Sequence, residues 1–389
     1  MTPNPLGIGV IGASPDHGWA AAAHLPALAT LPQYEVVAVG TTREETARKA
    51  ARKYGAAHAF TDPYRLAQHP DVDVVAVIVK VPHHVELVSA ALEAGKHVFC
   101  EWPLTTTSEQ AARLTSLAAS AGVHATVGLQ GRWAPAVVRA RALIAGGQIG
   151  RPVSVTAYAA RSVAAGAHLP RELAYTVDAD HAAGTLEVAG GHTLDTLQFL
   201  LSSELASMSA RLATQHRRIT LEGGRTVKAT SPDHLALHAS FAGGAMCVAH
   251  VHDAKASGAR TWIEISGTEG ELVIASAGSE ADRGLQIGAL TLSVAHGTAA
   301  PIELRTPDTP HRPEPYAAAR YNIAAQYAAL AEDISTGGNR AVSFADALAV
   351  HQLLDALRLS ARTGRRIDRL AGGSAPLSSP WPTTRRRRP

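Results

Sequence analysis

The stretch Leu6-Gly7-Ile8-Gly9-Val10-Ile11-Gly12-Ala13-Ser14-Pro15-Asp16-His17-Gly18 decides the fold. Its apolar run ends at a glycine, and the Ala- and Leu-rich segment at residues 20–31 predicts a helix directly after the turn. A strand that turns through glycines into a helix presents backbone N–H groups to a phosphate. The spacing is an imperfect G-x-G-x-x-G, because a serine replaces the middle glycine and the last glycine comes one residue late. The turn predicts a dinucleotide site, with an ordinary strand-to-helix turn as the alternative, and the predicted contacts are Gly12, Ser14, His17, Gly18 and Trp19.

Strand-like and helix-like segments alternate along the first 130 residues. The run at residues 72–79 is apolar and β-branched, as expected of a central parallel strand that is covered on both faces. This repetition predicts a doubly wound parallel sheet, which is an α/β Rossmann domain, at residues 1–130. The predicted strands lie at residues 6–11, 35–39, 72–79, 97–100 and 125–129, and the helices at 20–31, 43–54, 83–94 and 108–121.

After residue 130 the pattern becomes that of an α+β domain, which we place at residues 131–371. Short turns such as Gly243-Gly244 separate its strand-like runs, so we expect a large, mainly antiparallel, open-faced sheet. Residues 276–318 show no clear pattern and are interpreted as long loops. Residues 372–389 have the composition of a disordered tail. The predicted strands are 152–160, 235–241, 246–252, 261–267 and 270–274, and the helices are 135–145, 321–335 and 345–360.

Composition excludes several classes of protein. The chain has 389 residues, enough for two domains, and its 46% hydrophobic and 18% charged residues are typical of a globular protein. The net charge is only +3, and four arginines lie together at residues 385–388, so we expect no nucleic-acid partner. We also expect no membrane partner, because no apolar run reaches the roughly 18 residues that span a bilayer. We expect no signal peptide, because residues 1–5 lack a basic region and strand-like sequence follows at once. Two cysteines, Cys100 and Cys247, favour free thiols in the cytoplasm.

The end of the second predicted strand bears on the choice of dinucleotide. An acidic residue about 20 residues after the glycine turn would hold the ribose 2′-hydroxyl of NAD. This sequence instead has Thr41, Thr42 and Arg43, whose hydroxyls and guanidinium suit the 2′-phosphate of NADP. We predict NADP as the preferred cofactor and NAD as the other. Alternatively, the threonines only cap the next helix and the arginine is solvated.

Several further motifs resemble one family. They are His24-Leu25-Pro26-Ala27-Leu28, residues 91–98 leading into Glu101-Trp102-Pro103, Gly131-Arg132-Trp133-Ala134-Pro135 and Gly191-His192-Thr193-Leu194-Asp195. Together with the glycine turn they resemble the Gfo/Idh/MocA (glucose–fructose oxidoreductase / inositol dehydrogenase) family, closely up to residue 149 and more loosely beyond. Three more stretches are similar to the branch of the fungal galactose-regulon repressor and its oxidoreductase-like relatives: Val79-Lys80-Val81-Pro82, residues 129–132 and Ser231-Pro232-Asp233-His234.

The resemblance implies an NAD(P)-dependent oxidoreductase. Such an enzyme transfers a hydride between nicotinamide and a secondary alcohol or ketone of a sugar, cyclitol or related polyol. The resemblance also implies a homodimer or homotetramer packed through the second-domain sheet. The repressor binds a dinucleotide but acts through protein partners, so a non-catalytic regulatory protein is an alternative. A lyase, hydrolase or epimerase with transient oxidation is another.

The cofactor and substrate are expected at the carboxyl ends of the parallel strands. The predicted cofactor contacts there are Lys80, Val81, Pro82, His84, Glu101, Trp102, Pro103 and Arg132, and a cis bond before Pro103 is an option. The predicted substrate contacts are Trp102, Trp133, His181 and His192. For Arg132 and Trp133, packing between the domains is the alternative.

The family's usual proton-transfer pair is incomplete here. Trp102 stands where the family has a lysine, and Val188 stands where it has an aspartate four residues before the histidine. The tryptophan transfers no proton, so it either stacks on a ligand or packs. We predict His192 as the general acid/base, oriented by Asp195 on the same helix face, with Lys80 as the replacement lysine. A structural histidine and a solvated lysine are the alternatives.

Two observations concern other acidic and histidine side chains. Glu187 lies one position from the expected aspartate and would replace it only if the backbone shifted. His250 and His252 share one face of a predicted strand, but no Cys/His cluster has zinc-like spacing, so we predict no metal site.

Overall fold

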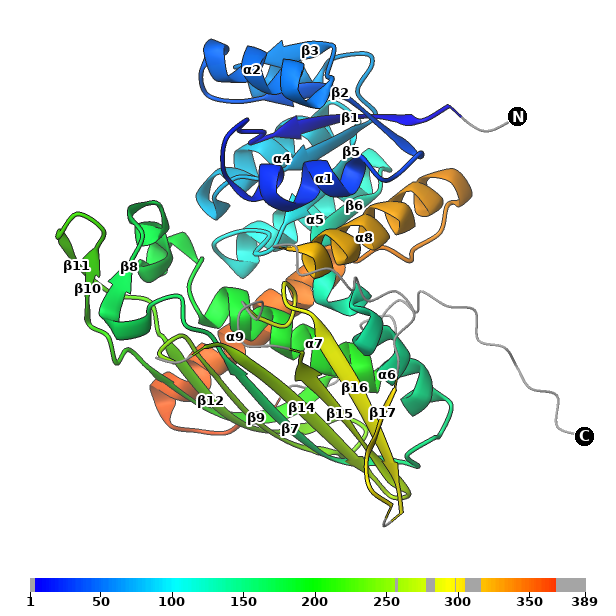
Figure 1. The fold of residues 1–389 in the computed structure, drawn as a ribbon, viewed down its shortest axis with the longest axis vertical. Coiled ribbons are helices and arrows are strands. Elements are labelled where there is room, and N and C mark those ends of the chain that lie inside the picture. The colour runs from blue at the N-terminus through cyan, green and yellow to red at the C-terminus, as the bar shows by residue number, and fades with distance from the viewer. Residues whose placement is uncertain (1–3, 256–257, 278–283, 298, 305–315, 369–389) are drawn as a thin grey trace, which may run out of the picture.

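Six parallel strands form the first sheet, in the order β3-β2-β1-β4-β5-β6 (Figure 1). This is the strand order of a Rossmann fold, which binds its ligand outside the carboxyl ends of the strands where the order reverses, beside β1 and β4. The predicted doubly wound α/β sheet is confirmed. The strands are β1 (Leu6–Ile11), β2 (Tyr34–Gly40), β3 (His58–Phe60), β4 (Val74–Val77), β5 (His97–Glu101) and β6 (Ala125–Gly128).

The computed structural model describes residues 4–255, 258–277, 284–297, 299–304 and 316–368. The predicted tail at residues 372–389 lies outside these ranges. None of the helices in the described ranges combines the length and the apolar composition that crossing a bilayer requires.

Helices pack on both faces of the first sheet. Val75 and Val77 of β4 pack in one core cluster with side chains of α4 and α5. Val74 and Ala76 point the other way, into a second cluster with side chains of η1 and α1. The helices of this part of the chain are η1 (Ala20–His24, a π-helix), α1 (Leu25–Leu28), α2 (Glu44–Tyr54), α3 (Pro63–Ala67), η2 (Val81–His83), α4 (His84–Glu93) and α5 (Ser108–Ala121).

A helix from the end of the chain completes the second cluster. Ile323, Tyr327 and Leu330 of α8 (Ala317–Thr336) are fully buried there, and α8 lies beside the first sheet in Figure 1. The predicted domain boundary at residues 130/131 stays a prediction. Although α8 follows this boundary in the sequence, it packs against the first sheet, which the sequence did not indicate.

Nine strands form the second sheet, in the order β17-β16-β15-β14-β7-β13-β12-β9-β18. Only β7 and β13 are parallel neighbours, so the predicted, mainly antiparallel sheet is confirmed. Two of these strands lie within residues 276–318, which we interpreted as loops. The strands are β7 (Pro152–Ala160), β9 (Leu205–Ala213), β12 (His234–Phe241), β13 (Met246–His252), β14 (Arg260–Gly267), β15 (Gly270–Ser276), β16 (Leu290–His296), β17 (Ile302–Leu304) and β18 (Ile367–Asp368).

Three helices cover the inner face of this sheet: α6 (Pro135–Ala145), α7 (Gly191–Leu201) and α9 (Phe344–Thr363). The other face of the sheet is exposed, so exposed and buried residues alternate along its strands. In β13, for example, Met246, Val248 and His250 are exposed and the residues between them are buried. This alternation is what an open-faced sheet requires.

A small three-stranded sheet forms a lobe at one side of the molecule (Figure 1). We define the lobe as residues 163–181 and 217–230. It contains β8 (His168–Leu169), β10 (Arg218–Leu221), β11 (Thr226–Lys228) and the 3-10 turn η5 (Arg171–Val177). Its own small core includes Leu169, Ile219 and Leu221. These short elements carry little hydrophobic periodicity, and the sequence did not predict them.

Candidate functional site

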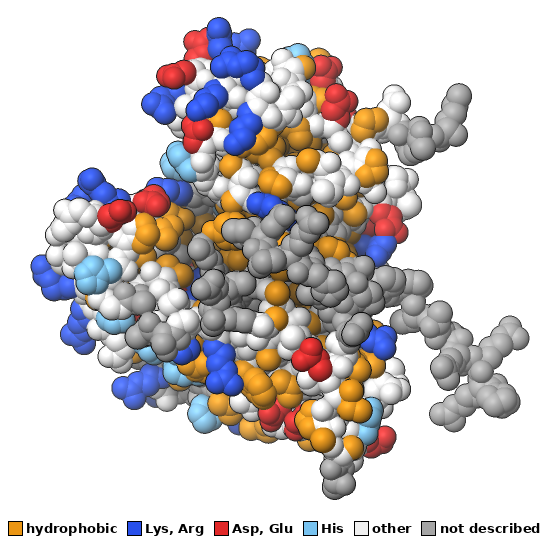
Figure 2. Space-filling model, viewed as in Figure 1, with side chains coloured by type: hydrophobic (Ala, Val, Ile, Leu, Met, Phe, Trp, Pro, Cys, Tyr) orange, Lys and Arg blue, Asp and Glu red, His pale blue; other side chains and the backbone are white. Residues whose placement is uncertain are grey.

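A cavity of about 940 Å³ lies at the carboxyl ends of β4 and β5, between the first sheet, α7 and the lobe. Figure 2 shows the hollow between the upper domain and the lobe, with hydrophobic side chains on the lobe beside it. The site residues that line the cavity, of those predicted from the sequence, are His17, Gly18, Trp19, Lys80, Val81, His84, Glu101, Trp102, Pro103 and His192.

The glycine turn is fixed on one side and open on the other. Gly12 has a φ of +93°, and a Cβ there would lie 2.1 Å from the Ile78 carbonyl oxygen, so only glycine fits. Gly18 also has a φ of +93°, but a Cβ there would meet no atom within 4 Å among the described residues. The Tyr54 hydroxyl, at the end of α2, donates to the Ser14 carbonyl and so helps to hold the glycine turn. This arrangement fits a dinucleotide pyrophosphate, although Gly12 and Ser14 themselves lie outside the cavity lining.

The residues predicted to contact the ribose lie at the start of α2, outside the cavity lining. The Thr41 hydroxyl donates to the Arg43 carbonyl at 2.9 Å and lies 2.7 Å from the Thr46 hydroxyl, so it holds the turn before the helix. Thr42 and Arg43 are exposed. Arg43 is the N-cap residue, and its side chain makes no capping hydrogen bond. Its guanidinium and the Thr42 hydroxyl therefore remain the groups suited to a phosphate.

His84 connects the ends of β4 and β5. Its Nδ1 lies 2.9 Å from the Pro103 carbonyl oxygen, and its Nε2 lies 3.1 Å from the Val79 carbonyl oxygen. Burial lowers the pKa of His84, although these carbonyls oppose that shift. The Trp102–Pro103 bond is cis, as the sequence allowed. Pro82, between the two strand ends, does not line the cavity.

The Glu101 carboxylate is held in the cavity wall. His24 Nε2 lies 3.0 Å from Glu101 Oε1, and His24 Nδ1 lies 3.0 Å from the hydroxyl of Tyr327 on α8. A Cβ at Gly128 would come within 2.4 Å of the same carboxylate oxygen, so the glycine leaves the space it needs. A positioning role for Glu101 is consistent with these contacts.

Trp102 packs between the two domains. It is 5% exposed, and its Nε1 donates to the Glu187 carbonyl at 2.8 Å. Its ring lies 4.7 Å from the ring of His351 on α9, and a Cβ at Gly191 would come within 2.6 Å of Nε1. Of the two alternatives for this side chain, the structure shows packing, and only a small part of the indole lines the cavity.

The predicted contact between Asp195 and His192 is not formed. Both Asp195 oxygens accept hydrogen bonds from Arg132, at 2.6 to 3.1 Å, and Arg132 also reaches Asp346 on α9. A buried carboxylate beside a buried guanidinium gains more from this ion pair than from a neutral imidazole. Arg132 and Asp195 therefore join the two domains. Neither residue lines the cavity, so the cofactor contact predicted for Arg132 and the catalytic contact predicted for Asp195 stay predictions.

His192 lies in the cavity wall as a neutral imidazole. It is 4% exposed, and its Nδ1 has no hydrogen-bond partner in the described part of the chain. Burial lowers its pKa to about 3, and the nearby charge of Arg161 acts in the same direction. The ring is therefore neutral at neutral pH, and His192 is one of the residues that line the cavity.

Glu187 lies in a π-helical turn, η7 (Leu186–Gly190), directly before α7. The backbone thus does shift by one residue at this point, as a replacement for the missing aspartate would require. However, Glu187 Oε1 accepts a hydrogen bond from Arg358 at 2.7 Å, and Glu187 does not line the cavity.

Arg161, Asp253 and Thr185 form a buried polar cluster that the sequence did not reveal. Arg161 Nε donates to Asp253 Oδ1 at 2.6 Å, and the Thr185 hydroxyl donates to Asp253 Oδ2 at 2.6 Å. All three line the cavity. A signal was present, because Arg161 and Asp253 directly follow β7 and β13, and parallel strands end at the same edge of a sheet.

On two more residues of the cavity wall, a buried polar atom has neither a hydrogen bond nor an ion pair among the described residues. These atoms are Gln130 Oε1, just after β6, and Ser231 Oγ, just before β12. Buried polar groups are nearly always hydrogen-bonded, so such atoms indicate a binding surface for a ligand with hydroxyl groups.

Lys80 lies in the cavity wall and its side chain contacts the lobe. Its side chain is exposed, and its Nζ lies 4.5 Å from the centre of the Tyr175 ring on η5. His181 does not line the cavity, because its Nδ1 pairs with the Tyr175 carbonyl and its ring lies behind that tyrosine. Trp133 is also outside the lining and packs in the second core cluster, so packing holds for it as well.

Comparisons with known proteins agree with this geometry. The model of the "oxidoreductase family, NAD-binding Rossmann fold" matches residues 6–129, and that of the "Gal80p, C-terminal domain" matches residues 135–276. Dehydrogenase aclE of Aspergillus oryzae is 34% identical over 50% of this chain and 54% of its own length. Galactose/lactose metabolism regulatory protein GAL80 of Saccharomyces cerevisiae is 28% identical over 62% of this chain and 59% of its own. The chain thus covers less than two thirds of either relative.

A third relative is matched over more of its length. The 1,5-anhydro-D-fructose reductase of Ensifer adhaerens is 31% identical over 68% of this chain and 74% of its own length. The solved structure of levoglucosan dehydrogenase in complex with NADH and levoglucosan gives a TM-score of 0.80 at 26% identity, over 94% of this chain and 99% of that one. A super-repressor mutant of Gal80p from Saccharomyces cerevisiae gives 0.82 over 94% and 97%, and at 23% identity it shows the fold alone.

The glycine turn, the cavity at the strand ends and these matches agree from β1 to β15. The chain belongs to the Gfo/Idh/MocA oxidoreductase family, with an NAD-binding Rossmann domain and a Gal80-like C-terminal domain.

Proposed function

We propose that this chain is an NAD(P)-dependent oxidoreductase that acts on a secondary alcohol or ketone of a sugar, cyclitol or related polyol. The observation that carries the proposal is the set of unpartnered, buried polar atoms, His192 Nδ1, Gln130 Oε1 and Ser231 Oγ, on residues that line one cavity beside the glycine turn. Relatives named scyllo-inositol 2-dehydrogenase and levoglucosan dehydrogenase support the substrate class. A bound nicotinamide supplies the hydride acceptor or donor.

His192 orients the reacting hydroxyl in this proposal. A neutral imidazole with a free Nδ1 accepts a hydrogen bond from a carbinol O–H. With a pKa of about 3, the ring is a weak base, so positioning is the larger part of its role. Its proposed partner is Lys80, whose ammonium lies in the cavity wall. In ketone reduction, that ammonium donates the proton that the new hydroxyl needs.

The lobe favours a substrate with one apolar face. Val163, Leu173 and Val177 of the lobe are half-buried and line the cavity, whereas the polar side chains of Arg161 and His192 line it from outside the lobe. A ring that carries hydroxyls on one face and C–H groups on the other satisfies both surfaces.

Turnover on a panel of polyols and ring sugars, followed at 340 nm, tests the proposal. We expect Lys80→Ala and His192→Asn each to lower kcat by about 10²- to 10⁴-fold, the usual range for groups that transfer or direct a proton. Binding of NADPH should change less than threefold. The control is Lys228→Ala in β11, an exposed lysine outside the cavity lining. Unchanged turnover in both cavity variants would contradict the assigned roles.

We propose NADP as the preferred cofactor and NAD as the other. Thr42 and Arg43 are exposed where NAD-specific sites place an acidic residue. Lysines and arginines also gather over α2 (Figure 2). Arg43→Ala should weaken NADPH binding about tenfold and leave NADH binding unchanged, measured by quenching of tryptophan fluorescence. Equal losses for both cofactors would mean that Arg43 does not read the 2′-phosphate.

A second candidate function is that of a dinucleotide-binding regulatory protein. The observation that favours it is Trp102, which fills the position of the family lysine by packing against Gly191 and His351. This function predicts tight NADPH binding without turnover on any compound, together with a specific protein partner. A lyase, hydrolase or epimerase would instead form product without net change in absorbance at 340 nm.

We also propose a homodimer or homotetramer in the cytoplasm. Met246 and Val248, on the open face of β13, are 61% and 49% exposed, and apolar side chains side by side on an open sheet favour a partner. Light scattering after gel filtration measures the oligomer. Both cysteines are free and buried, in keeping with a reducing compartment.

A further inference from the structure

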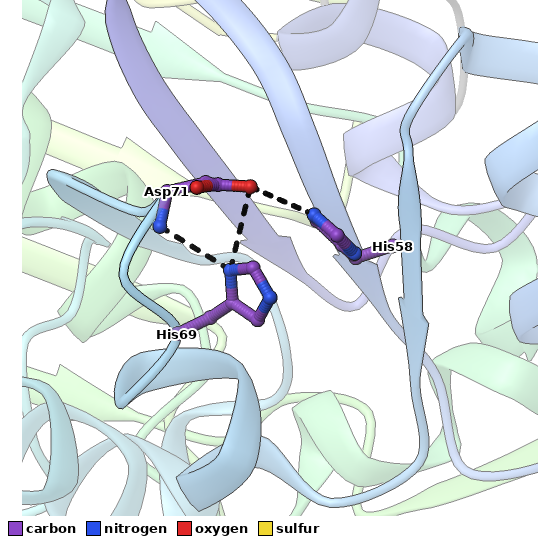
Figure 3. A group of neighbouring side chains, drawn as sticks. All are labelled: His58, His69 and Asp71. Atoms are coloured by element: carbon purple, nitrogen blue, oxygen red, sulfur yellow. Dashed lines mark hydrogen bonds and ion pairs between the residues drawn. The ribbon is translucent and has the colours of Figure 1, made fainter.

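Three side chains that bind metals meet at the far end of the first sheet from the cavity (Figure 3). His58 is the first residue of β3, and His69 and Asp71 lie in the connection from α3 to β4. They are therefore at the amino ends of the parallel strands, and none of them lines the cavity. The proposed oxidoreductase chemistry does not use them.

The distances between the ligand atoms suit a small cation. Asp71 Oδ2 lies 2.9 Å from His58 Nε2 and 3.8 Å from His69 Nδ1, and all three atoms lie within 4.8 Å of one another. The nearest point that is equidistant from three atoms so placed is at most about 2.4 Å from each of them, against zinc–ligand bonds of about 2.0–2.2 Å. Shifts of a few tenths of an ångström would thus complete the coordination.

A metal would replace the hydrogen bonds that the two imidazoles now make. The Asp71 backbone N–H donates to His69 Nδ1 at 3.3 Å, a long hydrogen bond that a metal at this nitrogen would displace. His58 Nε2 and Asp71 Oδ2 face each other across one shared hydrogen bond. A bound cation takes the place of that proton, which moves to the other ring nitrogen of His58 or to solvent.

The rings are held in this orientation before any metal binds. The centres of the His58 and His69 rings are 4.0 Å apart, and the Phe60 ring lies 6.3 and 5.7 Å from them. Packing of this kind lowers the entropy that the ligands lose on binding. All three ligand side chains are at least partly exposed, so a hydrated ion has access to them.

We propose that His58, His69 and Asp71 form a binding site for a divalent transition-metal ion, with Zn²⁺ as its preferred occupant. Two imidazoles and one carboxylate suit zinc better than magnesium or calcium, which favour oxygen ligands alone. Water completes the coordination. The ion ties the start of β3 to the connection before β4, so its effect is on stability and not on catalysis.

The positive charge of a neighbouring lysine opposes cation binding, so its removal should raise the affinity for Zn²⁺. The Lys96 ammonium donates to the His69 carbonyl oxygen at 3.3 Å, which places a positive charge near the proposed cation. Lys96→Gln should therefore bind Zn²⁺ more tightly than the parent chain, by about two- to fivefold at low salt. Weaker binding in this variant would count against the site.

The experiment is calorimetric titration of ZnCl₂ into the full chain after treatment with a chelator. We expect one site, and a loss of affinity of at least tenfold in both His58→Gln and Asp71→Asn. The control is His250→Gln, which alters a second group of neighbouring rings, those of His234, His250 and His252. Affinity that is lost in the control and kept in the other two variants would overturn the proposal, as would no binding by the parent chain.

Two further readouts separate loss of ligands from loss of fold. Co²⁺ in place of Zn²⁺ gives visible absorption bands that should disappear in His58→Gln while the far-ultraviolet circular dichroism stays the same. Zn²⁺ should also raise the Tm of the parent chain and not that of His58→Gln. Equal Co²⁺ bands in the parent and this variant would exclude His58 as a ligand.

Discussion

Trp102 and Gly191 depend on each other at the junction of the two domains. A Cβ at position 191 would lie 2.6 to 2.8 Å from three atoms of the indole, closer than packed atoms approach. The indole also donates to the Glu187 carbonyl, so it cannot move away without giving up the hydrogen bond of its buried N–H. A lysine at position 102, as in the family, would fill this space differently. The exchange of lysine for tryptophan is therefore a change of packing as well as of chemistry.

Gly191→Ala should lower the free energy of unfolding by about 1–3 kcal/mol, the usual cost of overpacking. Gly190→Ala is the matched control, because a Cβ there meets its nearest neighbour at 3.6 Å and alanine is the better helix former. Urea unfolding followed by tryptophan fluorescence measures both. In a chain that also carries Trp102→Leu, the cost of Gly191→Ala should shrink. An undiminished cost would mean that the indole is not what the methyl group meets.

His192 should make the fold sensitive to acid. Its pKa is about 3 in the folded chain and near the ordinary 6.5 when unfolded, so between these values only the unfolded chain binds the proton. The free energy of unfolding therefore falls as the pH falls from 6.5 towards 3, by up to about 1.4 kcal/mol per pH unit. His192→Gln should flatten this slope between pH 6.5 and 5 in urea titrations. The same change at the exposed His168 should leave the slope as it is.

At the scale of elements, the parallel pair β7 and β13 creates the polar end of the cavity. The two strands run in register from Ser154 with Met246 to Ala160 with His252, so the next residue of each, Arg161 and Asp253, meet at one edge. Their side chains are 11% and 9% exposed, and the Thr185 hydroxyl completes the hydrogen bonding of the carboxylate. The ion pair thus fixes the strand ends and lines the ligand space.

Asp253→Asn should cost about 3–5 kcal/mol of unfolding free energy, because it leaves the Arg161 guanidinium buried without a counter-charge. Asp368→Asn is the control, since its ion pair with Arg366 joins side chains that are 63% and 67% exposed and should contribute at most about 1 kcal/mol. Guanidinium unfolding of both variants measures the difference. Similar costs for the two would show that burial does not set the strength of the cavity pair.

The long periodic elements were predictable, and the short ones were not. The apolar runs that became β4 and β7 follow from local sequence, and so do the glycine turn and the strand-end position of Lys80. The lobe was missed because its strands of two to four residues are shaped by tertiary contacts. Helical spacing placed Asp195 on the same face as His192, but Arg132, 63 residues away, pairs with it. Sequence spacing gives a shared face and does not choose the partner.

At the scale of the molecule, α8 makes the dinucleotide domain depend on the end of the chain. Tyr327 is fully buried, its ring stacks on Phe99 of β5 at 4.3 Å, and its backbone carbonyl accepts a hydrogen bond from Tyr34 of β2. Its hydroxyl also contacts His24, the residue that holds Glu101 in the cavity wall. The chain therefore should unfold as one cooperative unit, although its order suggests two domains.

Tyr327→Ala should lower the free energy of unfolding by about 3–5 kcal/mol, the usual cost of removing a large buried aromatic side chain. It should also weaken NADPH binding, because His24 loses the contact that orients it towards Glu101. Tyr327→Phe is the control: it keeps the ring, loses one hydrogen bond and should cost only about 0.5–1.5 kcal/mol. Circular dichroism, tryptophan fluorescence and NADPH binding, followed through the same urea titration, should give coincident transitions. If NADPH binding survived after the circular dichroism and tryptophan fluorescence signals of the second domain were lost, the first domain would fold without α8.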